Sequence, residues 1–192
     1  MTSEPALRPA LQQRVAEAIL DGAARLFASE GEHASMNEVA EAAGVARATV
    51  YRYFPNREAL LNELAHAAVR DAGARLESAR IEAVAPPEGV VRAVRALVEM
   101  GDLFVILARE RRRSGADRFE SGLVDPVRKL IERGQASGDI RDDISDVRLA
   151  ESLIGLIVSL LTSTPALGRE DMTATITALF LDGAGARGPR PR

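Results

Sequence analysis

The sequence predicts an all-α fold with a packed core. Apolar residues recur at intervals of three and four along most of the chain, whereas β-branched and aromatic residues rarely alternate with polar ones. Hydrophobic residues make up 46% and charged residues 28% of the 192 positions, which is enough apolar material for a packed core. The absence of cysteine excludes a disulfide scaffold. The length fits one domain, or a small module fused to a larger one.

Three helices are expected in the first part of the chain. The first covers about residues 11–29 and presents one apolar face. Ser35 and Glu38 have the spacing of a capping box, which predicts a second helix of about two turns. Gly44 can adopt the left-handed conformation of a tight turn, and a third helix follows over about residues 46–53. Two short helices joined so closely indicate a helix-turn-helix.

More helices are expected after this motif. The next begins behind the cap Asn56 and should last until near Ala83, a length of about 40 Å at 1.5 Å per residue. The double proline Pro86-Pro87 interrupts the pattern, and further amphipathic segments follow it. These segments are expected from Pro87 to Gly101, over residues 102–113, over residues 123–137, from Asp146 to about Ser163, and around residues 172–180.

The segment around the third helix has a local positive charge. The whole chain carries a formal charge of −3, yet residues 44–57 contain three arginines and no acid. Arginine can pair with phosphates or guanine edges, and hydroxyls bond phosphate oxygens, so this segment suits double-stranded DNA. Taken singly, such residues are more often a solvated face, but the cap and the turn beside them favour DNA binding. The residues are Arg47, Arg52 and Arg57, with the hydroxyl-bearing Thr49, Tyr51 and Tyr53.

This part of the chain resembles the TetR family of bacterial regulators. The resemblance covers about residues 13–65 and is carried by residues 22–28 (GAARLFA), 35–40 (SMNEVA), 43–45 (AGV) and 48–61 (ATVYRYFPNREALL). It implies that residues 46–53 form the recognition helix, that the second helix also approaches DNA, and that Arg57 meets a phosphate. The DNA-binding residues expected on this basis are Ser35, Asn37, Arg47, Ala48, Thr49, Tyr51, Arg52, Tyr53 and Arg57.

One departure from the family concerns the start of the third helix. The family often has serine where this chain has Ala46, so the helix should lack a side-chain cap at a site where such caps contribute about 1 kcal/mol. Val50 and Phe54 are expected in the core of the domain.

The resemblance also implies that two parts of the chain have different functions. It predicts a DNA-binding domain over residues 11–57, with its motif at about 35–54, and a helical effector-binding and dimerisation domain over residues 58–183. Residues 1–10 and 184–192 are expected to be flexible tails. The implied function is a repressor released from a near-palindromic operator by a small-molecule inducer. A helical dimer that binds a protein partner and has lost DNA binding is the alternative, for which the missing cap at Ala46 is the only hint.

A homodimer interface is expected on the helix that begins at Asp146. Its two apolar stripes need two partners, and small residues between them would let a second helix approach closely, although a buried helix of a single domain could look the same. The expected interface residues are Ser152, Gly155, Leu156, Ser159, Leu160, Ser163, Ile176 and Phe180.

An inducer pocket is expected among apolar residues of the second domain, most of which will simply be core. The candidates are Leu97, Met100, Phe104, Leu107, Phe119, Leu123, Val127 and Ile157. The cluster of Arg109 and Arg111–Arg113 is better explained by the end of a helix, where cations meet the helix dipole, than by an anionic-ligand site.

Little in the sequence indicates catalysis, a metal or a membrane. His33 and His66 have no second ligand at metal spacing, and no nucleophile–base set stands out, so neither enzyme activity nor a cofactor is expected. The residues before Leu11 lack an apolar run, and the uncharged stretch 152–168 is densely apolar only over residues 153–161. A cytoplasmic protein without a membrane partner is expected.

Overall fold

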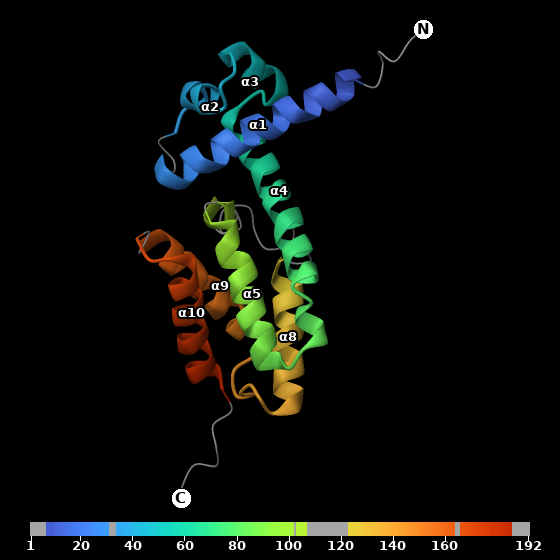
Figure 1. Ribbon diagram of the computed structural model, residues 1–192, viewed down its shortest axis with the longest axis vertical. Coiled ribbons are helices and arrows are strands. Elements are labelled where there is room, and N and C mark those ends of the chain that lie inside the picture. The colour runs from blue at the N-terminus through green and yellow to red at the C-terminus, as the bar shows by residue number, and fades with distance from the viewer. Residues whose placement is uncertain (1–6, 31–33, 102, 107–122, 164–165, 186–192) are drawn as a thin grey trace, which may run out of the picture. The chain divides into compact units, whose positions relative to one another are not determined.

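The structure is a computed structural model that describes residues 7–30, 34–101, 103–106, 123–163 and 166–185 (Figure 1). Over these residues the fold is helical, as the sequence predicts, and its extended pairing is limited to one bridge between Ile140 and Gly185. Among the helices that the structure describes, none combines the length and the apolar character needed to cross a lipid bilayer. The chain divides into two compact units, Met1–Ala67 and Ala68–Arg192.

The first unit consists of three helices and the beginning of a fourth. They are α1 (Leu7–Glu30), α2 (Met36–Ala42), α3 (Arg47–Tyr53) and the first part of α4 (Arg57–Ser78). This order confirms the predicted helix-turn-helix, and α1 begins four residues earlier than expected. Apolar side chains from all four helices fill the core, among them Ile19, Phe27, Val39, Val50, Leu60 and Leu64.

Gly22 lets α1 approach the end of α2 closely. A Cβ atom added at Gly22 would lie 2.8 Å from the backbone nitrogen of Ala43 and 3.0 Å from its Cα. Real Cβ atoms essentially never come this close to backbone atoms. The absence of a side chain at Gly22 therefore sets how tightly α1 and α2 pack.

The second unit is built around α5 (Pro86–Met100), which contacts each of the three long helices that follow it. These are α8 (Asp125–Ser137), α9 (Asp146–Ser163) and α10 (Arg169–Ala184). Figure 1 shows α5 lying between α8 and α10. The positions agree with the sequence prediction, and Gly138 ends α8 in the left-handed conformation. Of the helix expected over residues 102–113, the structure describes residues 103–106, which are helical.

The prediction that the fourth helix lasts until near Ala83 is wrong. α4 ends at Ser78, and after a turn a short 3-10 helix, η2 (Ile81–Ala83), follows. Arg80 has a φ of 50°, in the left-handed region, which breaks the helical hydrogen-bond pattern. At 1.5 Å per residue, the 22 residues of α4 span about 33 Å.

Two arginines from neighbouring helices hold the segment after α4. Arg133 on α8 donates hydrogen bonds from its guanidinium to the carbonyls of Ile81, at 2.9 Å, and Val84, at 2.8 Å, and also to that of Glu82. Arg92 on α5 donates to the carbonyl of Ala79 at 3.3 Å. These bonds join residues up to 52 positions apart, which explains why the local apolar pattern did not show where α4 ends.

We predict that Gly22→Ala lowers the free energy of unfolding by about 1–2 kcal/mol. Alanine is intrinsically the better helix former by about 1 kcal/mol, but the clash with the backbone at Ala43 should outweigh this gain. Gly183→Ala is the matched control, because Gly183 is also helical and a Cβ there meets nothing within 4 Å. Chemical denaturation of both variants measures the difference, and equal stability of the two would show that α1 and α2 can separate without cost.

Candidate nucleic-acid interface

The helix-turn-helix begins with the predicted capping box. The backbone N–H of Glu38 donates to the Ser35 hydroxyl at 3.3 Å, and the backbone N–H of Ser35 donates to the Glu38 carboxylate at 2.7 Å. Gly44 then makes the turn with a φ of 66°. The N–H of Gly44 donates to the carbonyl of Glu41 and that of Val45 to the carbonyl of Ala40, both at 3.0 Å. α2 and the turn therefore fix where α3 starts.

α3 separates the residues that anchor it from those that it displays. Val50 is fully buried and Phe54, which follows the helix, is 7% exposed, as predicted for core residues. Arg47, Ala48, Tyr51 and Arg52 are exposed, while Thr49 and Tyr53 are half-buried. Ala46 provides no side-chain cap, so the predicted gap in the capping of α3 is confirmed.

Each exposed arginine of α3 lies over a tyrosine ring. The Cζ atom of Arg47 is 5.4 Å from the ring centroid of Tyr51, and that of Arg52 is 5.3 Å from the ring centroid of Tyr53. Both distances fall within the range of cation–π contacts. Sequence reasoning did not identify these pairs, although the spacing of four between Arg47 and Tyr51 on a helix was a usable signal.

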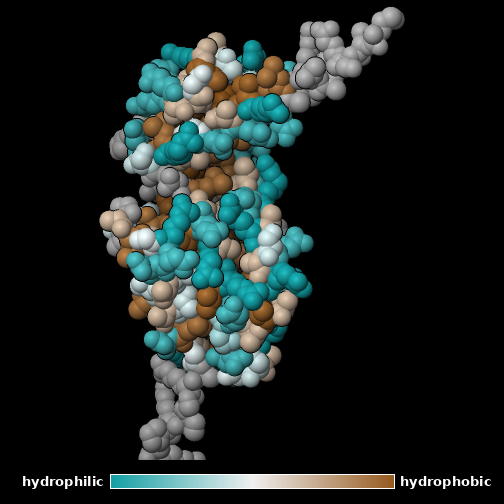
Figure 2. All heavy atoms as spheres, in the orientation of Figure 1, coloured by the Kyte–Doolittle hydropathy of each residue, from teal (hydrophilic) through white to brown (hydrophobic). Residues whose placement is uncertain are grey.

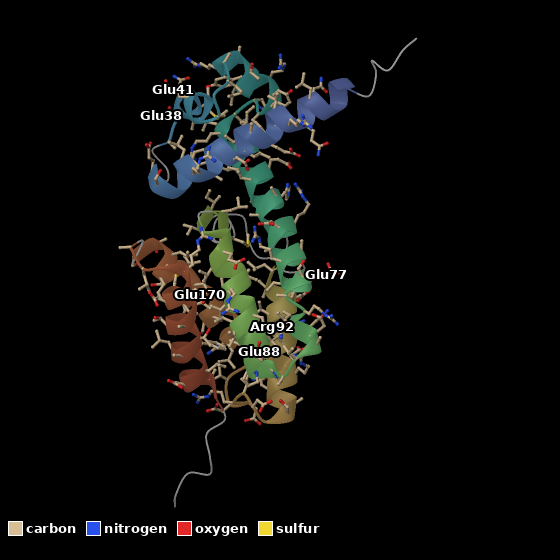
Figure 3. The ribbon with its side chains drawn as sticks, in the orientation of Figure 1. Glu38, Glu41, Glu77, Glu88, Arg92 and Glu170 are labelled. Atoms are coloured by element: carbon tan, nitrogen blue, oxygen red, sulfur yellow. The ribbon has the colours of Figure 1, made fainter. Side chains whose placement is uncertain are left out.

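Ser35 has a structural role in the capping box. Its hydroxyl donates its proton to the Glu38 carboxylate at 2.6 Å, so this hydroxyl has no second proton to offer to a phosphate. These hydrogen bonds from Ser35 hold the pKa of Glu38 below its ordinary value of 4.5. Figure 3 shows Glu38 and Glu41 on α2, and Asn37, directly before Glu38, is also exposed. The geometry favours an indirect contribution of Ser35, through the placement of α2.

Arg57 braces the junction between α1, α2 and α4. Its Cζ atom lies 4.8 Å from the ring centroid of Phe27 on α1, and its Nε donates to the carbonyl of Ala34 at 3.4 Å. The side chain is half-buried. Beside it, Asn56 caps α4 as predicted, since its side-chain oxygen accepts from the backbone N–H of Ala59 at 2.8 Å.

Part of the predicted dimer interface is exposed on α9. Ser152, Gly155, Ser159 and Ser163 are exposed, and Leu156 and Leu160 are half-buried. A Cβ at Gly155 would meet nothing within 4 Å. These residues recur at spacings of three and four and thus share one helical face.

The expectation for α10 needs correction. Ile176 is fully buried and Phe180 is 4% exposed, because α10 packs against α5 within the same chain. Their side chains are thus core of this subunit and not available surface. The large apolar residue that α10 exposes is Leu179, at 56%, and α9 exposes Val147, at 40%.

The described residues of the predicted inducer pocket all lie in the core of the second unit. Leu97, Phe104, Leu123, Val127 and Ile157 are fully buried and Met100 is 7% exposed, while Leu107 and Phe119 lie outside the described residues, as do Arg109 and Arg111–Arg113. The described pocket residues belong to α5, to residues 103–106, to α8 and the two residues before it, and to α9.

Two surface grooves among the described residues lie elsewhere in this unit. One, of about 610 Å³, runs between α4 and α5, where Figure 2 shows mostly hydrophilic side chains. Its arginines are paired with acids, for example Arg75 with Asp71 at 2.8 Å and Arg92 with Glu88 at 3.0 Å. The other, of about 580 Å³, is lined by Leu130 and Arg133 among others. In the part of the chain that the structure describes, no group of three metal-ligating side chains could hold a metal ion.

Residues 19–64 match the family model described as bacterial regulatory proteins, tetR family. The HTH-type transcriptional repressor LfrR of Mycolicibacterium smegmatis is 42% identical over 100 residues, which are 52% of this chain and 49% of that protein. The chain spans about half the length of the curated relatives it matches first, between 43 and 49%.

Solved structures resemble nearly the whole chain. The TetR-like regulator LfrR from Mycobacterium smegmatis in complex with proflavine covers 90% of this chain and 97% of its own, with a TM-score of 0.76 and 21% identity. AibR in complex with isovaleryl coenzyme A and operator DNA covers 86% of this chain and 97% of its own, with a TM-score of 0.70 and 22% identity. At this level of identity, the similarity establishes the fold.

We predict that Glu38→Gln lowers the melting temperature at neutral pH and that this loss shrinks in acid. Because the folded state lowers the pKa of Glu38, its ionised form adds stability above pH 4.5, and this contribution is lost as the pH falls through the folded pKa. Melting curves at pH 7 and below pH 4 measure the effect. Glu41→Gln, also exposed on α2, is the control without a capping role. A deficit of Glu38→Gln that does not change with pH would contradict the ionised capping box.

Proposed function

We propose that this chain, which belongs to the TetR family of bacterial regulatory proteins, is a transcriptional regulator that represses as a homodimer and releases its operator when a small molecule binds. The observation that carries this proposal is the two-sided character of α3. Val50 holds the helix in the core, while Arg47, Tyr51 and Arg52 face outward without a carboxylate partner among the described residues. A helix of this kind can enter the major groove of DNA.

The residues of α3 would divide between reading bases and holding the backbone. Arg47, in the first turn, is suited to base edges, because the N-terminal residues of a recognition helix meet them. Arg52, Thr49 and the tyrosine hydroxyls are suited to phosphates. Asn37 adds an exposed amide from α2. Ser35 and Arg57 would act through the placement of α2 and α4, given the contacts that engage them.

The homodimer would form through α9. Its face of small residues lies open in the single chain at Gly155, as a partner helix requires. Leu156 and Leu160, half-buried in one subunit, would be covered in the dimer, and Leu179 and Val147 add exposed apolar surface. A two-fold axis would then present two α3 helices to successive major grooves of a near-palindromic operator.

The inducer would bind among the buried apolar residues of the second unit, including Leu97, Phe104 and Ile157. Proflavine in one neighbour and isovaleryl coenzyme A in another are different molecules, so the shared fold does not fix the inducer. Release would be a population shift, in which the ligand prefers a conformation whose two α3 helices no longer match the operator.

We predict that Arg47→Ala narrows the affinity gap between operator and scrambled DNA by about 1–3 kcal/mol, because a bidentate arginine–guanine contact is lost. Operator fragments would first be recovered from the source genome by binding to the purified protein. Lys129→Ala is the charge-matched control, since Lys129 is an exposed cation of α8 in the second unit. Equal losses on both duplexes would make Arg47 a backbone contact, and recovery of no DNA would favour the protein-binding alternative.

We predict that Gly155→Leu weakens the dimer by about 1–3 kcal/mol, the usual cost of overpacking, because the new side chain would hold the two α9 faces apart. Gly183→Leu is the matched control, since a Cβ at Gly183 also meets nothing within 4 Å. Sedimentation at a series of concentrations measures both dissociation constants. If Gly155→Leu dimerises like the control, α9 does not form the interface.

A further inference from the structure

We propose that Tyr51 is a positioning residue for Arg47: its ring holds the Arg47 guanidinium so that the edge of that group can read a base. This inference rests on the proposed DNA-binding function and extends it to a specificity-determining pair. It assigns Tyr51 a role that depends on the aromatic ring and not on the hydroxyl.

The geometry of the pair supports this role. Arg47 and Tyr51 lie four residues apart on α3, so their side chains leave the same face of the helix. The Cζ atom of Arg47 is 5.4 Å from the ring centroid, and Tyr51 is 38% exposed, which leaves the pair open to solvent on the displayed side of the helix. Among the described residues, no carboxylate competes with the ring for the guanidinium.

Stacking prepares the guanidinium without using its hydrogen-bond donors. A guanidinium that stacks with its face on a ring keeps all five N–H groups available, because these groups lie in its plane. A bidentate contact with a guanine uses two of these in-plane groups. A solvated arginine explores many rotamers that binding would have to restrict, and the ring of Tyr51 restricts them before DNA arrives.

The second pair on α3 is built differently and shows why Tyr51 is the informative residue. Arg52 lies over the ring of Tyr53, and the centroid of this ring is 6.5 Å from that of Phe54, which is only 7% exposed. Loss of the Tyr53 ring would therefore disturb the core. The ring of Tyr51 has no such anchor among the aromatic contacts that the structure describes, so it can be removed while the fold is kept.

A double-mutant cycle tests the proposal. The full-length proteins are the unmodified chain, Arg47→Ala, Tyr51→Leu and the double variant, with Tyr51→Phe as the variant that keeps the ring and removes the hydroxyl. Each is titrated against an operator duplex and a scrambled duplex at one salt concentration, after a melting curve has confirmed its fold. The readout is the ratio of the two dissociation constants, which a purely structural role of Tyr51 would not change selectively.

We expect Tyr51→Leu to reduce the operator preference about two- to fivefold, the size of an exposed cation–π contact, when Arg47 is present. In the Arg47→Ala background the same change should have no effect on the preference. Tyr51→Phe should keep the preference, because a phosphate contact of the hydroxyl would be lost on both duplexes alike. Additive effects of the two substitutions, or a loss with Tyr51→Phe as large as with Tyr51→Leu, would overturn the assignment while leaving DNA binding intact. Failure of the unmodified chain to prefer any operator would instead overturn the proposed function.

Discussion

The burial of one side of α3 is the constraint on which the candidate interface depends. A helix of seven residues is too short to be stable by itself in water, so α3 has to be held by tertiary contacts. Val50, with Phe54 directly after the helix, provides that hold inside the first unit. This burial also determines which side chains of α3 point outward, because fixing one face of a helix fixes the direction of the opposite face. The missing cap at Ala46 is compatible with this arrangement, since packing and not the cap determines where the helix lies.

A second theme is the use of long polar side chains to satisfy backbone carbonyls at helix ends. Arg133 serves the segment after α4, and Arg169 at the start of α10 donates to the carbonyls of Val98 and Glu99 at the end of α5. Gln135 donates to the carbonyls of Arg141 at 2.9 Å and Ile144 at 2.8 Å between α8 and α9. The last carbonyls of a helix and those of the connections have no partner within a helix, and these contacts supply one. They also tie neighbouring helices of the second unit together.

The sequence was sufficient for most helices, because caps, glycine turns and apolar spacing are local signals. It failed at the end of α4, where Arg80 is left-handed and the carbonyls on either side of it accept hydrogen bonds from Arg92 and Arg133, far away in the sequence. It failed at Ile176 and Phe180, because an apolar stripe does not say whether its own subunit or a partner covers it. The sequence also did not show that the Ser35 hydroxyl donates its proton to Glu38, because a hydroxyl is equally suited to a helix cap and to a phosphate.

The brace at Arg57 has a consequence for protein engineering. The guanidinium rests on the ring of Phe27 and reaches the carbonyl of Ala34, a planar arrangement that the compact ammonium of a lysine does not reproduce. These contacts lie apart from the outward positions of α3. The outward side chains of α3 can therefore be replaced by those of another recognition helix while Phe27 and Arg57 are kept. Such a replacement would change which DNA sequence is preferred and would leave the contacts between α1 and α4 in place.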